Sequence, residues 1–251
     1  EKFYQIISAP KIYMDLESAE MVKHATNSFL AMSISFINEI ADICETVGSD
    51  VRKVVEGLKA DGRIGARAFL SPGIGYAGGT LGRDIAVLSD FGKSKKLKTH
   101  IIDAVRDVNN SRQKKIVEKI KNILGSLRNK KISILGLTYK PGTSTLRRSM
   151  SLEIAKKLLA DGAKIKAFDP KIINSIKGFS GVEICPDAYS AIADADAILL
   201  ATDWPEFKQL DFAKIKKIAG KAAVVDCKNF LSSESIKNYG LAYYGIGFKT
   251  K

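Results

Sequence analysis

The stretch NKKISILGLTYKPG, residues 129–142, separates two parts of the sequence that have different patterns. Its apolar run from Ile132 to Leu137 is short and is closed by turn residues, which is typical of a buried strand. Before this stretch, apolar residues recur at helical spacing; after it, strand and helix patterns alternate. The sequence therefore predicts an α + α/β fold, in which an all-helical part is followed by a part built on a parallel sheet.

The part that follows residue 142 repeats strand and helix patterns in alternation. Short apolar runs predict strands in KIKAFDP (164–170), ADAILLATDW (195–204) and KAAVVDCKNF (221–230). Helical spacing occurs in SLEIAKKLLADGAK (151–164) and FKQLDFAKIKKIAG (207–220). Alternation on this scale implies crossover helices between parallel strands. We place the domain boundary near Leu127, which gives domains of 1–127 and 128–251 joined by a long helix without a flexible linker.

The helical part begins with a segment, Ser18 to about Thr46, that contains neither Gly nor Pro. Two adjacent apolar rows run along it, one formed by Val22, Ala25, Phe29, Met32, Phe36, Ile40 and Ile43, and the other by Leu30, Ile34, Ile37, Ala41 and Cys44. A helix with two apolar faces must be covered on both, so we expect one face to pack within its own domain and the other against a second subunit. Further helices are predicted within 48–63, from Asp84 to Phe91, and from Leu97 to Leu127.

Composition excludes several classes of protein. The chain has 251 residues, 45% of them hydrophobic, and no apolar stretch approaches the roughly 20 residues that cross a bilayer. The three cysteines are far apart and there are only two histidines, so neither a disulfide framework nor a metal site is predicted. A reducing, cytoplasmic location fits this pattern. The opening EKFYQIISAP has no initiator Met and no apolar signal-peptide core, so we interpret the sequence as part of a longer protein.

The formal net charge of +13 is concentrated in one region. Residues 93–131 carry 13 lysines and arginines against three acidic residues. One interpretation is a nucleic-acid-binding face, and the other is a long helix with a solvated basic surface. Because no pattern of an RNA-recognition motif, zinc finger or basic zipper accompanies the charge, we favour the solvated helix and expect no nucleic acid partner.

A glycine-rich stretch, SPGIGYAGGTLGRD (71–84), contains G-x-G-x-x-G at Gly73, Gly75 and Gly78. A dinucleotide-binding fingerprint needs a strand directly before the first of these glycines and a helix directly after the last. The preceding IGARAFLSP is not a convincing strand, and Pro72 removes a backbone donor, so we interpret the match as coincidental. Five glycines between residues 73 and 82 still allow the backbone to approach a ligand closely and to point N–H groups at anionic oxygen.

Ordered motifs across nearly the whole chain from Ser18 carry a family resemblance. SAEMVKHATNSFLAMSISFINEIADICETVG (18–48), DGRIG (61–65) and the glycine loop ending in GRD resemble the central domain of UDP-glucose/GDP-mannose dehydrogenases. ILGLTYKPGTSTLRRS (134–149), AFDP, ATDWPEF, VVDCKN and YYGIG resemble the C-terminal UDP-binding domain of that family, in the same order. No segment resembles the family's N-terminal NAD-binding domain, and no true dinucleotide fingerprint occurs.

The resemblance implies both a fold and an activity. Family enzymes oxidise the sugar C6 alcohol of a nucleotide sugar to a carboxylate in two NAD-dependent steps, as in polysaccharide biosynthesis. The implied fold is a helical dimerisation domain (1–127) and a Rossmann-like nucleotide-sugar-binding domain (128–251). The implied partners are a UDP-sugar and a second copy of the chain, bound through the long first helix. NAD would be held mainly by a domain outside this sequence.

The resemblance also implies catalytic roles for four residues. Lys23 and Asn27 are four apart, so they share one helix face. They match the Lys and Asn that hold water and the oxyanion at C6, where negative charge develops. Asp84 matches the Asp that assists proton transfer and orders water. Thr80 occupies the position of the family's catalytic Cys. Without the resemblance, Lys23 and Asn27 would be interpreted as a solvated helix face, and Asp84 as an acid at a helix N-terminus.

Other matches imply binding roles. The implied substrate contacts are Gly73, Gly75, Tyr76, Ala77, Tyr139, Lys140, Lys228 and, reaching the substrate of a neighbouring subunit, Arg63. Arg83 and Arg147 match cofactor contacts, and no metal ligand is implied. Lys228 stands where the family commonly has an Arg, so it retains the charge but loses bidentate geometry. Surface basicity is the alternative interpretation for the cationic members of this set.

Departures from the family pattern leave three hypotheses. A Thr hydroxyl has a much higher pKa than a thiol, so Thr80 is a poor substitute for a nucleophile that must form a thioester. Arg83 replaces the usual Lys, Ala77 and Gly79 alter the loop, and Arg148 stands where an acid is usual. The chain therefore belongs to a UDP-sugar dehydrogenase, to a paralogue that oxidises once or only binds nucleotide sugar, or to a basic nucleic-acid-binding helical protein.

Overall fold

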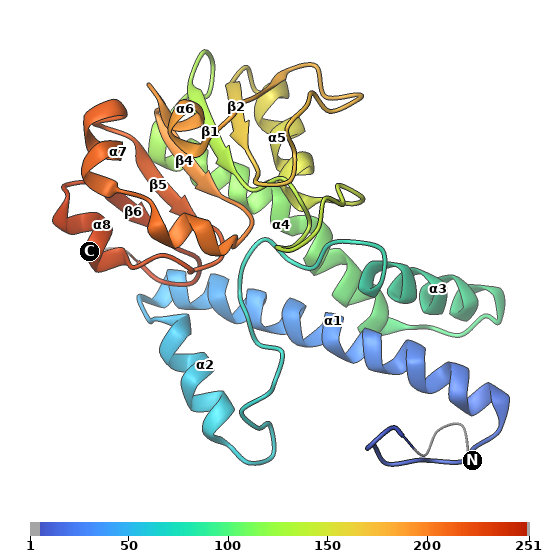
Figure 1. Cartoon of the computed structure of the whole chain (residues 1–251). Helices are drawn as coiled ribbons and strands as arrows, with labels where there is room; N and C mark the ends of the chain where they lie inside the picture. Colours follow the sequence, from blue (N-terminus) through green and yellow to red (C-terminus); the bar gives the residue numbers. More distant parts are fainter. Residues whose placement is uncertain (1–5, 250–251) are drawn as a thin grey trace.

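A computed structural model describes residues 6–249 and begins with four helices (Figure 1). They are α1 (Leu16–Val47), α2 (Val51–Ala60), α3 (Leu81–Ser94) and α4 (His100–Leu124), and the described residues before 131 contain no strand. The prediction of a helical first part is thereby confirmed. Several helix boundaries differ from the prediction by a few residues, and two of these differences matter for the site and for the junction with the sheet. α3 begins at Leu81, so Asp84 lies within its first turn. α4 ends at Leu124 because Gly125 has a φ of 74°, and its N–H bonds to the Lys121 carbonyl.

The second part is a six-stranded, wholly parallel sheet. Its strands are β1 (Lys131–Leu135), β2 (Lys164–Phe168), β3 (Val182–Ile184), β4 (Ala197–Leu200), β5 (Ala223–Asp226) and β6 (Ala242–Tyr244), in the order β3-β2-β1-β4-β5-β6. The predicted α + α/β class is confirmed, and all four predicted strands are present. Sequence analysis missed β3 and β6, which are three-residue edge strands with too few residues to show a pattern. The strand order reverses between β1 and β4, which is where doubly wound folds bind ligands.

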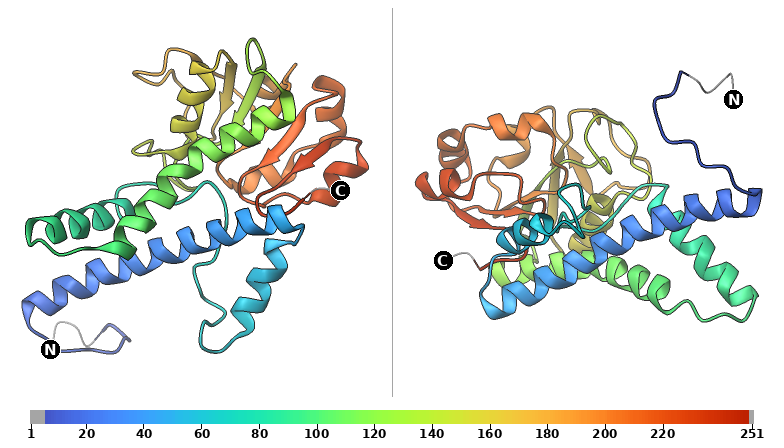
Figure 2. Two further views of the ribbon diagram at one scale, coloured as in Figure 1. Left: turned by 180° about the vertical axis from the view of Figure 1, so that it is seen from behind. Right: turned by 90° about the horizontal axis from the view of Figure 1, so that it is seen from below.

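Helices cover both faces of this sheet. The remaining helices are α5 (Met150–Ala160), α6 (Ala188–Ile192), the 3-10 helix η2 (Pro205–Gln209), α7 (Phe212–Ile218) and α8 (Ser233–Asn238). Buried side chains of α4 and α5 pack on one face, and those of α6, α7 and α8 pack on the other (Figure 2). Because the sheet is covered on both faces, every residue of the central strands β4 and β5 is buried.

The hydrophobic core under α4 continues into the helical part. Ile37 and Cys44 of α1 and Val51 of α2 belong to the same buried cluster as the strands. The end of the chain strengthens this junction, because the Val51 N–H bonds to the Gly247 carbonyl at 2.9 Å and the Gly247 N–H bonds to Glu45 Oε1 at 2.7 Å. The two parts are therefore joined by shared core as well as by α4.

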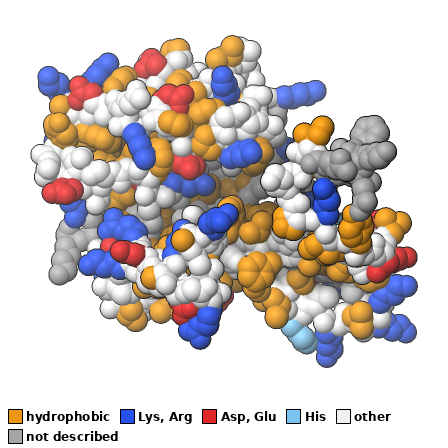
Figure 3. Space-filling model, turned by 60° about the horizontal axis from the view of Figure 1, so that its bottom comes forward, with side chains coloured by type: hydrophobic (Ala, Val, Ile, Leu, Met, Phe, Trp, Pro, Cys, Tyr) orange, Lys and Arg blue, Asp and Glu red, His pale blue; other side chains and the backbone are white. Residues whose placement is uncertain are grey.

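The two apolar rows of α1 have different environments. The row that contains Ile34, Ile37 and Ala41 is buried within the chain. In the other row, Val22, Phe29, Phe36 and Ile43 recur every seven residues, and about half or more of each is exposed: 52%, 62%, 48% and 56%. Figure 3 shows hydrophobic side chains gathered over the lobe in which α1 runs. Within residues 6–249, no helix has the length and apolarity needed to span a membrane.

Candidate functional site

Packing of α1 against α3 gathers four of the predicted residues into one polar cluster. The Asp84 side chain has no exposed surface. Its Oδ2 accepts a short hydrogen bond from Asn27 Nδ2, and its Oδ1 accepts one from Arg83 Nε at 3.2 Å. Lys23 Nζ in turn donates to Asn27 Oδ1 at 3.2 Å. The helix face that carries Lys23 thus meets the residue that closes the glycine loop.

The environment of Asp84 keeps its carboxyl group ionised. Burial by itself raises the pKa of Asp84, but the hydrogen bonds from Asn27 and Arg83 and the positive charges of Arg83 and His24 outweigh it, so this pKa lies below the ordinary value. A carboxylate with two donors and a nearby ammonium group can accept a proton or orient water.

One member of this cluster, His24, was missed by the sequence analysis. Its Nδ1 lies 3.5 Å from Asp84 Oδ1 and is buried without a hydrogen bond, whereas 32% of the side chain is exposed. A single histidine within a helical pattern carries no signal of its own. Its role became visible only when α3 was placed against α1.

Thr80 occupies the N-cap position of α3, one turn before Asp84. Its carbonyl accepts the Asp84 N–H at 3.1 Å, and its side chain is exposed and makes no capping hydrogen bond. The hydroxyl is therefore free to face solvent or a ligand. All three thiols of the chain, at Cys44, Cys185 and Cys227, are buried elsewhere, and burial raises the pKa of Cys227 to about 12.

Side chains of α1 and α4 hold the start of the glycine loop. The Gly73 N–H donates to Asn38 Oδ1 at 2.8 Å, and the Gly73 carbonyl accepts from Arg112 Nε at 3.2 Å. A Cβ at Gly73 would lie 2.6 Å from the Cys227 carbonyl oxygen, so only glycine fits against the end of β5. Asn38 and Arg112 were also missed, although Asn38 interrupts a row of apolar residues and could have been noticed.

The middle of the loop is fixed by Asn109. Its Oδ1 accepts the Tyr76 N–H at 2.8 Å, and its Nδ2 donates to the Tyr76 carbonyl at 3.2 Å. Gly75 has a φ of 96°, and a Cβ there would collide with Asn109 and crowd Arg112. Burial raises the pKa of Tyr76 to about 12, so its phenol stays neutral at physiological pH. Ala77 lines a cavity of about 380 Å³ beside this segment.

The far end of the loop meets the sheet domain. A Cβ at Gly78 would lie 2.8 Å from the Tyr139 ring, and one at Gly79 would lie 3.9 Å from Arg147 Nη1. The Lys228 side chain reaches the start of the loop, with its Cδ 3.9 Å from where a Cβ of Gly73 would lie. The structure thus gathers Tyr139, Arg147 and Lys228 around the loop.

Two of the predicted residues make no contact with the loop. Lys140 is exposed, with its Nζ 5.6 Å from the centre of the Tyr139 ring. Arg63 is 90% exposed and bonds to Asp61 Oδ2 at 2.6 Å. It lines a separate cavity of about 510 Å³ that also includes Phe29 of the exposed row of α1.

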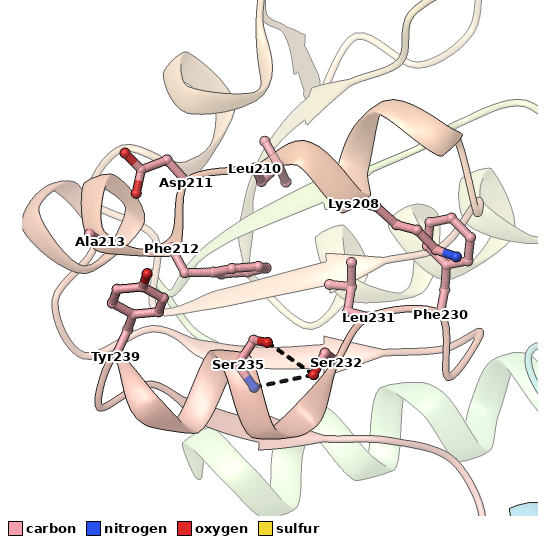
Figure 4. A pocket seen from close by; sticks show the side chains of 10 residues that line it. All are labelled: Lys208, Leu210, Asp211, Phe212, Ala213, Phe230, Leu231, Ser232, Ser235 and Tyr239. Atoms are coloured by element: carbon pink, nitrogen blue, oxygen red, sulfur yellow. Dashed lines mark hydrogen bonds between the residues drawn. The ribbon is translucent and has the colours of Figure 1, made fainter.

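A larger cavity, of about 1000 Å³, lies between α7 and α8 (Figure 4). None of the predicted residues lines it. Its polar groups do not converge on one point: Lys208 lies over the Phe230 ring at 4.3 Å, and Ser232 and Ser235 bond to each other. The candidate site is therefore the smaller region around the loop. In residues 6–249, no group of three or more His, Cys, Asp or Glu is arranged to hold a metal ion.

A helical domain with a buried polar cluster lies on one side of the glycine loop, and a doubly wound sheet lies on the other. Family models match both parts. Residues 17–111 match the central domain of the UDP-glucose/GDP-mannose dehydrogenase family, and residues 133–233 match its UDP binding domain. The chain belongs to this family.

Individual relatives are consistent with that membership. The chain is 41% identical over 249 residues to UDP-glucose 6-dehydrogenase TuaD of Bacillus subtilis, covering 98% of this chain and 54% of that protein. It is 38% identical over 245 residues to a UDP-glucose 6-dehydrogenase of Rickettsia bellii, covering 96% and 56%. A UDP-glucose dehydrogenase structure from Pyrobaculum islandicum superposes with a TM-score of 0.86 at 29% identity, covering 98% and 55%. The chain thus spans about half the length of these relatives.

Proposed function

We propose that this chain supplies the substrate-binding and acid–base parts of an NAD-dependent UDP-sugar 6-dehydrogenase. The observation that carries the proposal is the arrangement around the glycine loop. One side of the loop leads into the buried cluster of Asn27 and Asp84, and the other side faces Tyr139 and Lys228. A nucleotide sugar has one anionic end and one reacting end. The side of the loop that faces Lys228 offers a cationic group for the anionic end, and the Asp84 cluster offers acid–base groups for the reacting end.

The polar cluster can stabilise the charges of alcohol oxidation. As the C6 alcohol loses a hydride and a proton, negative charge develops on its oxygen. The Lys23 ammonium and the Asn27 amide are donors suited to that oxygen, and preorganised donors of this kind lower the barrier. Asp84, held as a carboxylate, is suited to accept the proton through water.

Residues 6–249 do not form a complete NAD site. The G-x-G-x-x-G match follows a segment without a strand, so the strand–loop–helix cradle of a dinucleotide is missing from the described residues. Arg83 and Arg147 are exposed guanidinium groups at either side of the loop and are suited to supplementary contacts with phosphate or ribose oxygens. When bound, NAD supplies the hydride acceptor of the reaction.

Thr80 supports a second candidate, a protein that oxidises the sugar only once or only binds it. A thioester route needs a thiolate, and the loop offers an exposed hydroxyl instead. Oxidation of a hydrated aldehyde would be needed for the second step. The number of NADH molecules produced per sugar by the longer protein distinguishes the two candidates, because complete oxidation yields two and a single oxidation yields one.

A second copy of the chain is the proposed partner of α1. The seven-residue repeat of exposed apolar side chains supports a helix-to-helix interface, since monomers rarely expose such a row. The cavity that holds Arg63 borders this row at Phe29, so a dimer would bring Arg63 close to the other subunit. Three buried thiols without a disulfide support a reducing compartment, which we propose to be the cytoplasm.

Isothermal titration calorimetry on this chain tests the substrate proposal. UDP-glucose and UDP should bind, whereas duplex DNA should show no tight binding at two salt concentrations. DNA binding with a steep salt dependence, together with no UDP-sugar binding, would overturn the proposal in favour of a nucleic-acid-binding protein. Titration with GDP-mannose separates UDP-sugar from GDP-sugar specificity.

A further inference from the structure

His24 occupies a place in the candidate site that the proposed reaction does not use. Its Nδ1 faces Asp84 Oδ1 at 3.5 Å, buried and without a hydrogen bond. The other carboxylate oxygen, Oδ2, is already bonded to Asn27. His24 and Arg83 therefore both face Oδ1, the Asp84 oxygen that Asn27 does not bond.

The position of His24 connects a buried group with solvent. Asp84 has no exposed surface, so it cannot exchange a proton directly with bulk water in this conformation. About a third of the His24 side chain is exposed, at 32%. Part of the imidazole therefore lies in solvent while its inner nitrogen stays beside the carboxylate.

Few other charges face His24. From α3, the charged groups are Asp84 and Arg83. On α1 itself, Lys23 is adjacent, and Glu20 lies one turn earlier on the same face. α4 reaches α1 at Ser35, which bonds to the Val105 carbonyl three turns further along the helix.

We propose that His24 is a positioning residue of the candidate site, whose imidazolium form holds Asp84 at Oδ1 and limits its use as a proton acceptor. Loss of the proton from His24 removes that charge, leaves Arg83 as the cation bonded to Oδ1, and makes the carboxylate a better proton acceptor. For turnover, this inference rests on the proposed function. The contact itself can be tested without any substrate.

Melting temperatures of this chain test the contact. The ion pair requires a charged imidazole, so its contribution is compared at an acid pH, where histidines are charged, and at an alkaline pH, where they are neutral. His24→Gln should lower the melting temperature by a few degrees more at the acid pH than at the alkaline one. His100→Gln is the matched control: His100 is exposed in the first turn of α4, where a positive charge is unfavourable, so its loss should cost nothing extra at acid pH. An equal loss for His24→Gln at both pH values would overturn the contact.

The pH profile of the longer protein tests the consequence for turnover. Wild-type kcat/KM should fall several-fold on acidification, and His24→Gln should remove that acid limb. His24→Lys, which is charged at both pH values, should be slow at both, provided that its melting temperature shows a folded protein. Identical profiles for the three proteins would overturn the positioning role. Absence of UDP-sugar turnover in all three would instead overturn the proposed function, while the melting temperatures still decide the contact.

Discussion

Asn27 on α1 donates a hydrogen bond to Asp84 on α3, although the two residues are 57 positions apart in the sequence. This bond joins the start of the long helix to the end of the glycine loop. It also fixes the amide group of Asn27, because its Oδ1 accepts from Lys23 while its Nδ2 donates to Asp84. The hydrogen bonds of this cluster therefore run in one direction, from Lys23 to Asn27 and from Asn27 to the buried carboxylate of Asp84.

Removal of Asn27 should destabilise the chain and perturb its carboxylate partner. Asn27→Ala leaves the buried Asp84 with one donor fewer, so unfolding in denaturant should show a loss of about 1–3 kcal/mol. The pKa of Asp84 should rise, because the hydrogen bond from Asn27 lowers it. A carboxyl pKa that is lower in the folded chain stabilises the fold at pH values above the ordinary carboxyl pKa of 3.8. This stabilisation is lost as the pH falls below 3.8, so the difference in unfolding free energy between variant and wild type should shrink there. Asn110→Ala, at an exposed position of α4, should cost less than about 0.5 kcal/mol; an equal loss would contradict a special role for Asn27.

Conversion of Thr80 into cysteine should favour complete oxidation. In the longer protein, Thr80→Cys should raise the NADH produced per UDP-sugar to two, because an exposed thiol at this helix N-terminus can form the thioester. Ser71→Cys adds an exposed thiol earlier in the same loop and should leave the ratio unchanged. If wild type already produces two NADH per sugar, the second step does not depend on a thiol.

The backbone of the loop should not tolerate a side chain at Gly75. Gly75→Ala forces a left-handed φ on a residue that disfavours it and pushes Asn109 and Arg112 aside. We expect a loss of about 1–3 kcal/mol in unfolding free energy, with weaker UDP-sugar binding. Gly62→Ala is the control, since a Cβ there meets nothing within 4 Å. Similar stability of the two variants would show that the loop relaxes easily.

Charge on the exposed row of α1 should dissociate the proposed dimer. The double variant Phe29→Glu/Phe36→Glu places two carboxylates on the face that would be buried, and buried unpaired charge is costly. Sedimentation velocity should show a dimer for wild type and a monomer for the variant. Ile173→Glu changes an 84% exposed apolar residue outside α1 and should remain dimeric. A monomeric wild type at micromolar concentration would contradict the interface.

Lys228 should contribute charge rather than bidentate geometry to substrate binding. Lys228→Ala should weaken UDP-glucose binding about tenfold, which corresponds to roughly 1.4 kcal/mol. Lys228→Arg should bind UDP-glucose at least as well as wild type, because a guanidinium group can donate hydrogen bonds to two phosphate oxygens at once. Calorimetry checks both, with the exposed Lys157→Ala on α5 as the matched control. Equal affinity for Lys228→Ala and the control would exclude contact between Lys228 and the nucleotide.

Much of the fold could be predicted because its signals are local. The absence of Gly and Pro over α1, and the short apolar runs of β1, β2, β4 and β5, specify element type through periodicity. The edge strands β3 and β6 could not be predicted, since three residues show no period. The sequence predicted helix ends less accurately than helix positions. The apolar pattern continues to Leu127, but α4 ends at Leu124 because Gly125 has a positive φ.

For the candidate site, the order of motifs indicated which residues to examine, and the resemblance supplied their roles. Tertiary structure decided which of them meet. Arg63 and Asp84 follow motifs of similar strength, yet one is exposed beside α1 and the other is fully buried. Asn109 and Arg112 carry no sequence pattern, because a hydrogen-bond partner that is tens of residues away leaves no mark on local spacing.

The sequence alone determined the division into a helical part and a sheet part, and the apolar faces that must be covered. Periodicity and residue chemistry depend on residues that are close together in the sequence, so both can be inferred without a structure. Only the packing of α1 against α3 and of the loop against β5 decided which donors surround Asp84. The ionisation of a buried carboxylate depends on groups within a few ångströms in space, whatever their distance along the chain.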